Sequence, residues 1–300
     1  MKAAASVLGL APRSTPTIGS ILVQGGQLKA EDVERVLQYQ REHKLRFGEA
    51  AVRLGLIGEA DIQFALSQQF AYAYLPVHRA DQQPLSRELV AAYEPFSPRT
   101  EQLRAIRSQL MLRWFNKRAG RQTLAIVGAQ RSEGRSNLAA NLAVVFSQLG
   151  ERTLLVDADL RQPRQHFIFA LENRMGFSTL LAGRSRDEVI VRIPDLPGLS
   201  VLPAGPTPPN PLELLNRLNL DEFLIQVKNA FDVVILDTTA LALGEDAAML
   251  AVKTGSALAI ARAGQTRIAA FKDLVQGLSD TGTAVVGTVL NEVPLKRRFR

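Results

Sequence analysis

One segment constrains the fold of this chain more than any other, because it places an apolar run, a polar loop and a helix start in direct succession. Residues 123–128 read TLAIVG, which suits a buried parallel strand, and a helix is predicted over 137–149. The loop between them, residues 129–136, contains Gly134 and Ser136. Phosphate binding needs backbone N–H groups at a helix start, a glycine for close approach, a cation, and a hydroxyl for Mg²⁺. The segment therefore predicts a site for the phosphates of a nucleotide.

The loop departs from the common phosphate-binding pattern at two positions. Arg135 stands where the pattern G-x-x-x-x-G-K-[ST] has lysine, and Ala129 stands at the first glycine. Arginine is bulkier than lysine and presents a planar fork rather than a point charge. This departure therefore bears on turnover more than on binding. The residues assigned to the nucleotide are Gln130, Arg131, Ser132, Glu133, Gly134, Arg135, Ser136 and Asn137.

Two further apolar runs deliver carboxylates where the chain leaves a predicted sheet. Residues 153–156 precede Asp157 and Asp159, and residues 232–236 precede Asp237. One such aspartate would equally suit a helix cap, but three beside a phosphate loop are predicted to orient Mg²⁺ and a nucleophile. Further strands are expected at 199–202, 257–261 and 285–290. The pattern predicts an α/β fold of the P-loop NTPase type, with a doubly wound, mostly parallel sheet.

The amino-terminal third contains an internal repeat. Residues 17–40 align with residues 46–69 at one constant offset. The identical positions are Gly19, Val23, Gly26, Asp32, Leu37 and Gln40 in the first copy and Gly48, Val52, Gly55, Asp61, Leu66 and Gln69 in the second. Each copy predicts a small helical hairpin, which is too short to bury its own apolar face. The two copies are therefore expected to pack on each other.

Composition narrows the classes of cofactor and partner. The chain has no cysteine and three histidines, which excludes disulfides and thiolate metal sites and favours a hard cation held by oxygen ligands. The net charge of +7 indicates an anionic partner. Aromatic residues make up only 6% and no basic stretch is interleaved with stacking rings, so nucleic acid is not expected. No uncharged apolar run approaches the length of a membrane span.

Breaks in the pattern divide the chain into two predicted domains. A helical repeat domain is expected over 17–79 and a nucleotide-binding domain over 99–294. Several prolines place the linker within 80–98. Residues 1–16 are interpreted as a disordered tail, and 295–300 as a basic tail suited to peripheral contact with an anionic membrane.

The motifs of the second domain resemble the bacterial tyrosine autokinase family, and with the repeat they resemble its subgroup called chain length determinant protein tyrosine kinase EpsG. The resemblance rests on residues 133–143 and on the runs LLVDADLRQP, GFSTLLAG, LPAGPTPPNPLELL and FDVVILDT. It implies an enzyme of exopolysaccharide biosynthesis that uses ATP and Mg²⁺. It also implies a membrane-bound polysaccharide chain-length determinant as partner, and a cytoplasmic protein held at the inner membrane through that partner.

The same resemblance implies roles for individual residues. Catalytic roles fall on Arg135, Asp157, Asp159 and Asp237. Roles in binding Mg²⁺ fall on Ser136, Asp159 and Asp237. Asn291 matches a position that reads adenine in related ATPases, and its alternative role is that of a turn-former before Pro294.

A charged motif precedes the phosphate loop. Glu101, Arg104 and Arg107 follow one another at a spacing of three, which places them along one face of a predicted helix. Spacing alone favours a solvated, salt-bridged stripe. The family resemblance instead implies a contact with the neighbouring subunit of a homo-oligomeric ring.

The repeat domain resembles the amino-terminal domain of type II secretion and pilus ATPases. Some members of that family bind cyclic di-GMP through an opening Arg-x-Gly and a closing Gln. The residues that match these positions are Arg46, Gly48 and Gln69 in the second copy, and Thr17, Gly19 and Gln40 in the first, where threonine replaces the arginine. The alternative is a docking module whose glycines only shape the packed hairpins.

The sequence is compatible with three functions. The first is an ATP-using tyrosine autokinase, although the chain ends NEVPLKRRFR and its four tyrosines precede the expected kinase domain. The second is a regulatory module of polysaccharide assembly that is gated by ATP and cyclic di-GMP without phosphorylating tyrosine. The third, a partition or division-site ATPase, is disfavoured because Gln130 and Arg131 occupy the place of its signature lysine.

Overall fold

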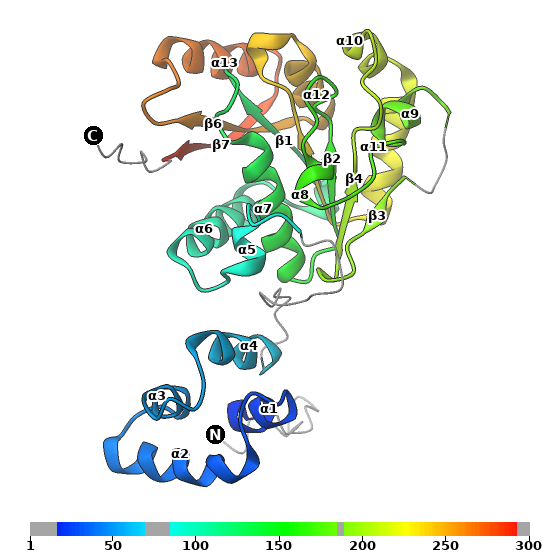
Figure 1. The fold of residues 1–300 in the computed structure, drawn as a ribbon. Coiled ribbons are helices and arrows are strands. Elements are labelled where there is room, and N and C mark those ends of the chain that lie inside the picture. The colour runs from blue at the N-terminus through cyan, green and yellow to red at the C-terminus, as the bar shows by residue number, and fades with distance from the viewer. Residues whose placement is uncertain (1–16, 70–84, 185–188, 293–300) are drawn as a thin grey trace, which may run out of the picture. The chain divides into compact units, whose positions relative to one another are not determined.

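The computed structural model describes residues 17–69, 85–184 and 189–292. The chain divides into two compact units, Met1–Pro76 and Val77–Arg300, and each is described by itself (Figure 1). The predicted tails 1–16 and 295–300, and residues 80–84 of the predicted linker, lie outside the described residues. Within the described ranges, no helix is long and apolar enough to cross a membrane.

The first unit consists of helices from the two copies of the repeat. They are α1 (Ile18–Gln24), α2 (Ala30–His43), α3 (Phe47–Arg53) and α4 (Glu59–Gln69). Gly26 and Gly55 lie at the equivalent turns with φ angles of 73° and 68°, a left-handed conformation that glycine adopts without strain. The apolar side chains of both copies form one cluster, in which Leu22, Val36 and Ala65 are fully buried. The two hairpins therefore share one core, as the repeat predicts.

The second unit is built on a seven-stranded sheet in the order β3-β4-β2-β5-β1-β6-β7. The strands are β1 (Thr123–Gly128), β2 (Thr153–Asp157), β3 (Val191–Arg192), β4 (Leu199–Leu202), β5 (Val233–Asp237), β6 (Ser256–Arg262) and β7 (Ala284–Asn291). Every neighbouring pair is parallel except β3 with β4. The predicted mostly parallel sheet is confirmed, and the short antiparallel edge strand β3 is an addition that the sequence pattern did not indicate.

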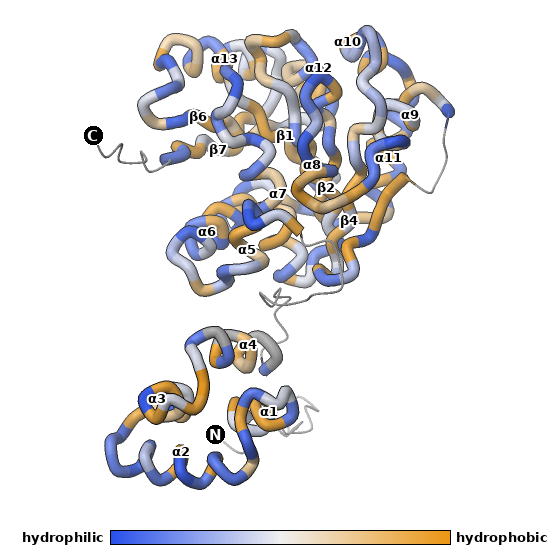
Figure 2. Tube along the Cα trace, in the orientation of Figure 1, coloured by the Kyte–Doolittle hydropathy of each residue, from blue (hydrophilic) through white to orange (hydrophobic). Residues whose placement is uncertain are grey.

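Helices cover both faces of this sheet. They are α5 (Val90–Tyr93), α6 (Pro98–Arg113), α7 (Arg135–Gln148), α8 (Gln165–Ile168), α9 (Phe177–Leu181), α10 (Pro211–Leu215), α11 (Leu218–Ala230), α12 (Asp246–Thr254) and α13 (Ile268–Asp280), with 3₁₀ turns at Lys117–Ala119 and Leu241–Leu243. Helices α9 to α13 share buried apolar clusters with the strands on one face, and α7 with α5 and α6 covers the other (Figure 1). Figure 2 shows that the central strands between these layers are predominantly hydrophobic.

Residues 85–98 of the predicted linker belong to the second unit, where they form α5 and lead into α6. Ala91 in α5 is fully buried, and its N–H donates to Asn141 Oδ1 of α7 at 3.0 Å. Pro98 occupies the first turn of α6, where proline is tolerated because the N–H that it lacks has no helical partner. The prolines here mark a turn and a helix start, so they do not indicate a solvated connection.

Candidate functional site

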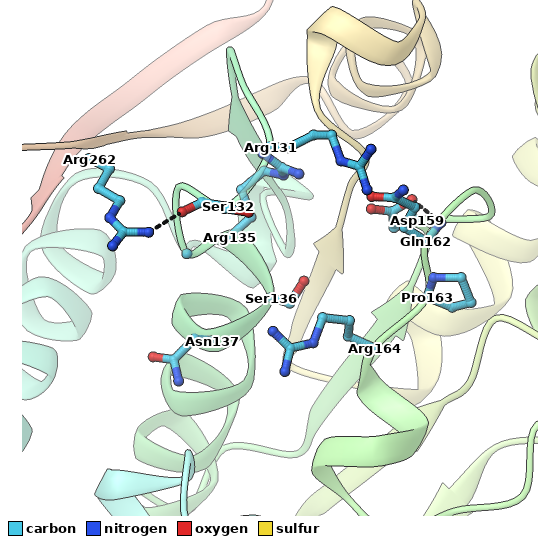
Figure 3. A pocket seen from close by; sticks show the side chains of 11 residues that line it. Arg131, Ser132, Arg135, Ser136, Asn137, Asp159, Gln162, Pro163, Arg164 and Arg262 are labelled. Atoms are coloured by element: carbon cyan, nitrogen blue, oxygen red, sulfur yellow. Dashed lines mark hydrogen bonds between the residues drawn. The ribbon is translucent and has the colours of Figure 1, made fainter. Parts of the chain in front are cut away.

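A pocket surrounds the turn from β1 into α7, at the carboxyl ends of the strands (Figure 3). Its lining residues are Arg131, Ser132, Gly134, Arg135, Ser136, Asn137, Asp159, Gln162, Pro163, Arg164 and Arg262. Arginine is the commonest of these residue types, and Asp159 is the acidic one. In Figure 3, Arg262 and Arg164 approach the loop from opposite sides. Converging cations of this kind favour a polyanionic ligand such as a nucleotide phosphate chain.

The loop predicted to bind phosphate, here called the phosphate loop (residues 129–134), leads into α7 through a glycine that has no room for a side chain. Gly134 is the N-cap of α7 and has a φ of 100°. A Cβ atom at this position would lie 2.3 Å from Nδ2 of Asn291. That amide group donates to the main-chain oxygen of Glu133 at 2.9 Å. The helix begins at Arg135, two residues before the predicted start at Asn137, so Arg135 and Ser136 lie in the first turn of α7 and the loop ends at Gly134.

Side chains from the β6–α13 segment form hydrogen bonds with the phosphate loop. Arg262 Nη1 donates to the carbonyl oxygen of Ser132 at 3.0 Å. The Thr266 hydroxyl donates to Glu133 Oε1 at 2.6 Å. Sequence reasoning missed both residues. Arg262 carried a usable signal, because it follows the predicted strand 257–261 at the edge of the sheet where ligands bind.

Arg135, at the lysine position, is buried and donates hydrogen bonds to two main-chain oxygens. Its Nε donates to the carbonyl oxygen of Thr238 at 3.0 Å, and its Nη1 donates to that of Gln130 at 2.6 Å. The carboxylate of Glu133, itself buried, lies 3.9 Å from Nη1. Arg135 therefore ties the phosphate loop to the end of β5, and Glu133 compensates its charge.

The predicted aspartates lie at the ends of adjacent strands, but they face different groups. Asp157 and Asp237 are register partners on β2 and β5, and both are fully buried. Asp159 lines the pocket. Asp157 Oδ2 accepts main-chain N–H groups of Arg164 and Gln165 at 3.0 and 2.8 Å. Asp157 therefore orders the segment after β2, and neither Asp157 nor Asp237 is among the residues that line the pocket.

Burial shifts the titration of these carboxyl groups. It raises the pKa of Asp237 to about 6, partly opposed by a hydrogen bond from Gln165 and one from Ser136. Burial, followed by the negative charge of Asp237, raises the pKa of Asp157 well above its ordinary value. No described residue donates to Oδ1 of either aspartate. Buried carboxylate oxygens without a donor fit a hydrated hard cation nearby, although no three acidic, histidine or cysteine side chains of the described ranges converge to hold a metal by themselves.

The raised pKa of Asp237 makes stability depend on pH. The folded value of about 6 exceeds the ordinary 3.8, so the folded state binds this proton more tightly than the unfolded state. The resulting stabilisation is fully present below pH 3.8 and is lost as pH rises through 6. At pH 7 we expect Asp237→Asn to be more stable than the wild type, on the order of 1–3 kcal/mol. Denaturant unfolding at pH 4 and pH 7 measures this, and a variant less stable than the wild type at pH 7 would contradict it.

Further residues of the site come from the segment that follows Asp159. Arg164 Nη2 donates to Glu88 Oε1 at 2.8 Å, which joins this segment to the chain before α5. Gln165 Nε2 donates to Asp237 Oδ2 at 2.8 Å. The sequence motifs predict neither Arg164 nor Gln165, although these two residues follow the run LLVDADLRQP.

The charged motif of α6 makes contacts within the chain. Arg104 Nη1 forms an ion pair with Glu101, whose side chain is exposed. Arg107 Nη1 donates to the carbonyl oxygen of Val145 in α7 at 2.8 Å. The spacing of three therefore allows an ion pair between Glu101 and Arg104 on one face of α6. Glu101 is the most solvent-exposed residue of the motif.

The glycines proposed for cyclic di-GMP lie at close contacts between helices of the first unit. A Cβ atom on Gly19 of α1 would lie 3.1 Å from Cζ of Phe47 in α3. A Cβ atom on Gly48 of α3 would lie 2.9 Å from Cδ1 of Ile62 in α4. Both glycines are buried. Packing of the helices by itself therefore requires small residues at these positions.

The remaining residues of that motif sit at helix ends. Thr17 is the N-cap of α1, where its hydroxyl accepts the N–H of Ser20 at 3.2 Å, and Arg46 is the exposed N-cap residue of α3. Gln40 lies in the last turns of α2, and Gln69 is the last residue of α4. The two copies thus present threonine and arginine at equivalent places.

The known proteins that this chain resembles are bacterial tyrosine kinases. No family model matches the chain. It is 36% identical over 214 residues to the tyrosine-protein kinase YwqD of Bacillus subtilis, covering 71% of this chain and 89% of that protein. It is 32% identical to the putative tyrosine-protein kinase CapB of Staphylococcus aureus, covering 68% and 89%. The kinase domain of the Escherichia coli tyrosine kinase ETK matches with a TM-score of 0.65 and 30% identity, covering 73% of this chain and 84% of that one.

Proposed function

The chain belongs to the bacterial tyrosine-protein kinases, and from this premise we propose that its second unit binds ATP with Mg²⁺ and transfers the γ-phosphoryl group to tyrosine. The observation that carries the proposal is the arginine-lined pocket, which joins the glycine-capped start of α7 to Asp159. Phosphoryl transfer needs little covalent chemistry from the protein beyond positioning and charge stabilisation. A loop of main-chain N–H groups, several cations and oxygen ligands for a metal supply both.

Each part of the site has a proposed role. The main-chain N–H groups at the start of α7 and the guanidinium groups of Arg131 and Arg262 hold the phosphates. Ser136, Asp159 and Asp237 would hold Mg²⁺, with Asp237 acting through a water of the hydrated ion. When bound, this ion would neutralise charge on the transferred phosphoryl group.

The contacts of Asp157 and Asn291 indicate supporting roles for these two predicted site residues. Asp157 acts through the segment that it orders, because its Oδ2 accepts main-chain N–H groups of that segment. Asn291 supports the phosphate loop through Glu133 and is our candidate for contact with adenine at the same edge of the site.

We propose that the kinase serves exopolysaccharide assembly with a membrane-bound chain-length determinant, which would hold a cytoplasmic enzyme at the inner membrane. The support is the likeness of five ordered motifs to that kinase family. The alternative is a regulator gated by nucleotide, favoured by the engagement of Arg135 with main-chain oxygens of the loop and of β5. Transfer of labelled γ-phosphate to tyrosine separates the two functions, because the regulator binds ATP without transfer.

Self-association through α6 is proposed for the ring, with Glu101 as the exposed contact. Reversing its charge in Glu101→Arg is expected to lower the molar mass seen by light scattering, because the exposed carboxylate would no longer meet a cation of the neighbour. Arg113→Glu changes an exposed charge at the end of the same helix and serves as the control. An unchanged mass for Glu101→Arg would leave the motif as an intrachain ion pair.

Binding of cyclic di-GMP is proposed for the first unit, mainly through the second copy of the repeat. A guanidinium at Arg46 can stack on guanine or grip phosphate, whereas the Thr17 hydroxyl already accepts an N–H of its own helix. We expect Arg46→Ala to abolish binding by the full chain and Thr17→Arg to tighten it, as measured by calorimetry. Arg53→Ala, in the last turn of α3, is the matched control. If even Thr17→Arg fails to bind, the docking interpretation holds.

A further inference from the structure

Gln165 is a fully buried glutamine that touches three separate parts of the site. It is the first residue of α8, the short helix after β2 (Figure 1). Its Nε2 donates to the carbonyl oxygen of Ser136 at 3.1 Å and to Asp237 Oδ2 at 2.8 Å. Its main-chain N–H donates to Asp157 Oδ2 at 2.8 Å. One residue therefore links the first turn of α7, the end of β5 and the end of β2.

The two N–H groups of the Gln165 side-chain amide hold two oxygens of the site, the Ser136 carbonyl oxygen and Asp237 Oδ2. Because Gln165 occupies Oδ2 of Asp237, the other oxygen, Oδ1, is left without a donor among the described residues. The same amide also holds the carbonyl group of Ser136, whose hydroxyl is a proposed metal ligand. Burial of an amide is costly unless it is hydrogen-bonded; here Nε2 donates to two acceptors of the site, and Oε1 has no donor among the described residues.

We propose that Gln165 is a positioning residue for the metal. It sets the orientation of the Asp237 carboxylate so that Oδ1 remains available to a water of hydrated Mg²⁺, and it fixes the distance between Asp237 and the first turn of α7. The inference rests on the proposed function, because it concerns how that site holds its metal. Groups that orient metal ligands from behind commonly change metal affinity by about 10- to 100-fold when they are removed.

A purely structural glutamine exists in the same unit and supplies a matched control. Gln122, before β1, is also buried, and its Nε2 donates to the carbonyl oxygens of Lys228 and Phe231 at 2.7 Å each. Like Gln165, it uses one amide group to join two acceptors. Its acceptors belong to α11 and to the turn before β5, so its loss tests stability alone.

The experiment compares Gln165→Met and Gln122→Met in the full chain, because methionine keeps the side-chain length and removes the donor. Measured quantities are the Mg²⁺ concentration for half-maximal ATP turnover, ATP affinity without Mg²⁺, and thermal stability. For Gln165→Met we expect the required Mg²⁺ concentration to rise at least about 10-fold, with ATP affinity in the absence of Mg²⁺ within about 2-fold of the wild type. Gln122→Met should lower thermal stability and leave the Mg²⁺ requirement unchanged.

The result that overturns the inference is a Gln165→Met protein whose Mg²⁺ requirement equals that of the wild type, or one that moves only in parallel with Gln122→Met. Gln165→Leu decides the same question if Gln165→Met does not fold. A wild type without Mg²⁺-dependent ATP turnover would instead refute the proposed function, and the inference with it, so the two failures are distinguishable.

Discussion

Replacing Ser136 and Asp159 together by alanine is expected to abolish Mg²⁺-dependent ATP binding, with an affinity at least about 100-fold lower than in the wild type. The hydroxyl in the first turn of α7 and the carboxylate in the pocket are the oxygen ligands that a hard cation prefers. Without them the negative charge of the phosphates is left to the arginines alone. Calorimetry of the full chain with and without Mg²⁺ measures the loss.

A matched pair of substitutions guards this result against a general loss of folding. Ser147→Ala removes a hydroxyl near the far end of α7, where it donates to its own helix, and Asp221→Ala removes an aspartate of α11 that pairs with Lys253. The double control should bind ATP with Mg²⁺ as the wild type does. If the Ser136 and Asp159 double variant retains wild-type affinity, the assignment of the metal side of the pocket is wrong.

Two substitutions of Arg135 are expected to distinguish the contribution of its positive charge from that of its guanidinium hydrogen bonds. In Arg135→Ala, turnover should fall by about 100-fold or more, as for loss of a preorganised group that stabilises developing charge. Thermal stability should fall as well, because Glu133 would remain as a buried carboxylate without a cation. In Arg135→Lys, turnover should be retained or raised, because a compact ammonium provides the point charge and releases the carbonyl oxygens of Gln130 and Thr238.

Steady-state kinetics with saturating Mg²⁺ distinguish these outcomes. Arg121→Lys, an exposed arginine whose guanidinium stacks over Trp114, is the control for the conservative change and should leave turnover unaltered. A lysine variant as inactive as Arg135→Ala would show that the two hydrogen bonds of the guanidinium, rather than its charge, are what the site requires.

The sheet was predictable because most of its strands are apolar runs, and β1, β2 and β5 each end in a polar or small residue. Edge strand β3 was not, since its two residues are exposed and carry no apolar pattern. The linker was placed too far along the chain for a related reason. Proline is common both in solvent-exposed turns and in the first turn of a buried helix. The burial of Ala91 against α7 shows that this stretch is packed and not a solvated linker.

The candidate site followed from the sequence only as far as backbone topology determines it. Parallel strands bring their carboxyl ends to one edge, so Asp157 and Asp237 could be placed beside the phosphate loop in advance. The direction of the Arg135 side chain and the contacts of Gln165 could not, because both depend on main-chain oxygens supplied by distant segments. Hydrogen bonds of this kind have no sequence pattern of their own.

Transfer of labelled phosphate tests the central claim most directly. The full chain is incubated with γ-labelled ATP, with and without Mg²⁺, alone and with an acidic tyrosine-containing copolymer, and the labelled residues are located by mass spectrometry. The account predicts phosphotyrosine that requires Mg²⁺ and is absent in Asp237→Asn, the variant expected to be the more stable protein at pH 7. Label on no tyrosine, from a wild type that binds ATP with Mg²⁺, would contradict the kinase and leave the nucleotide-gated regulator.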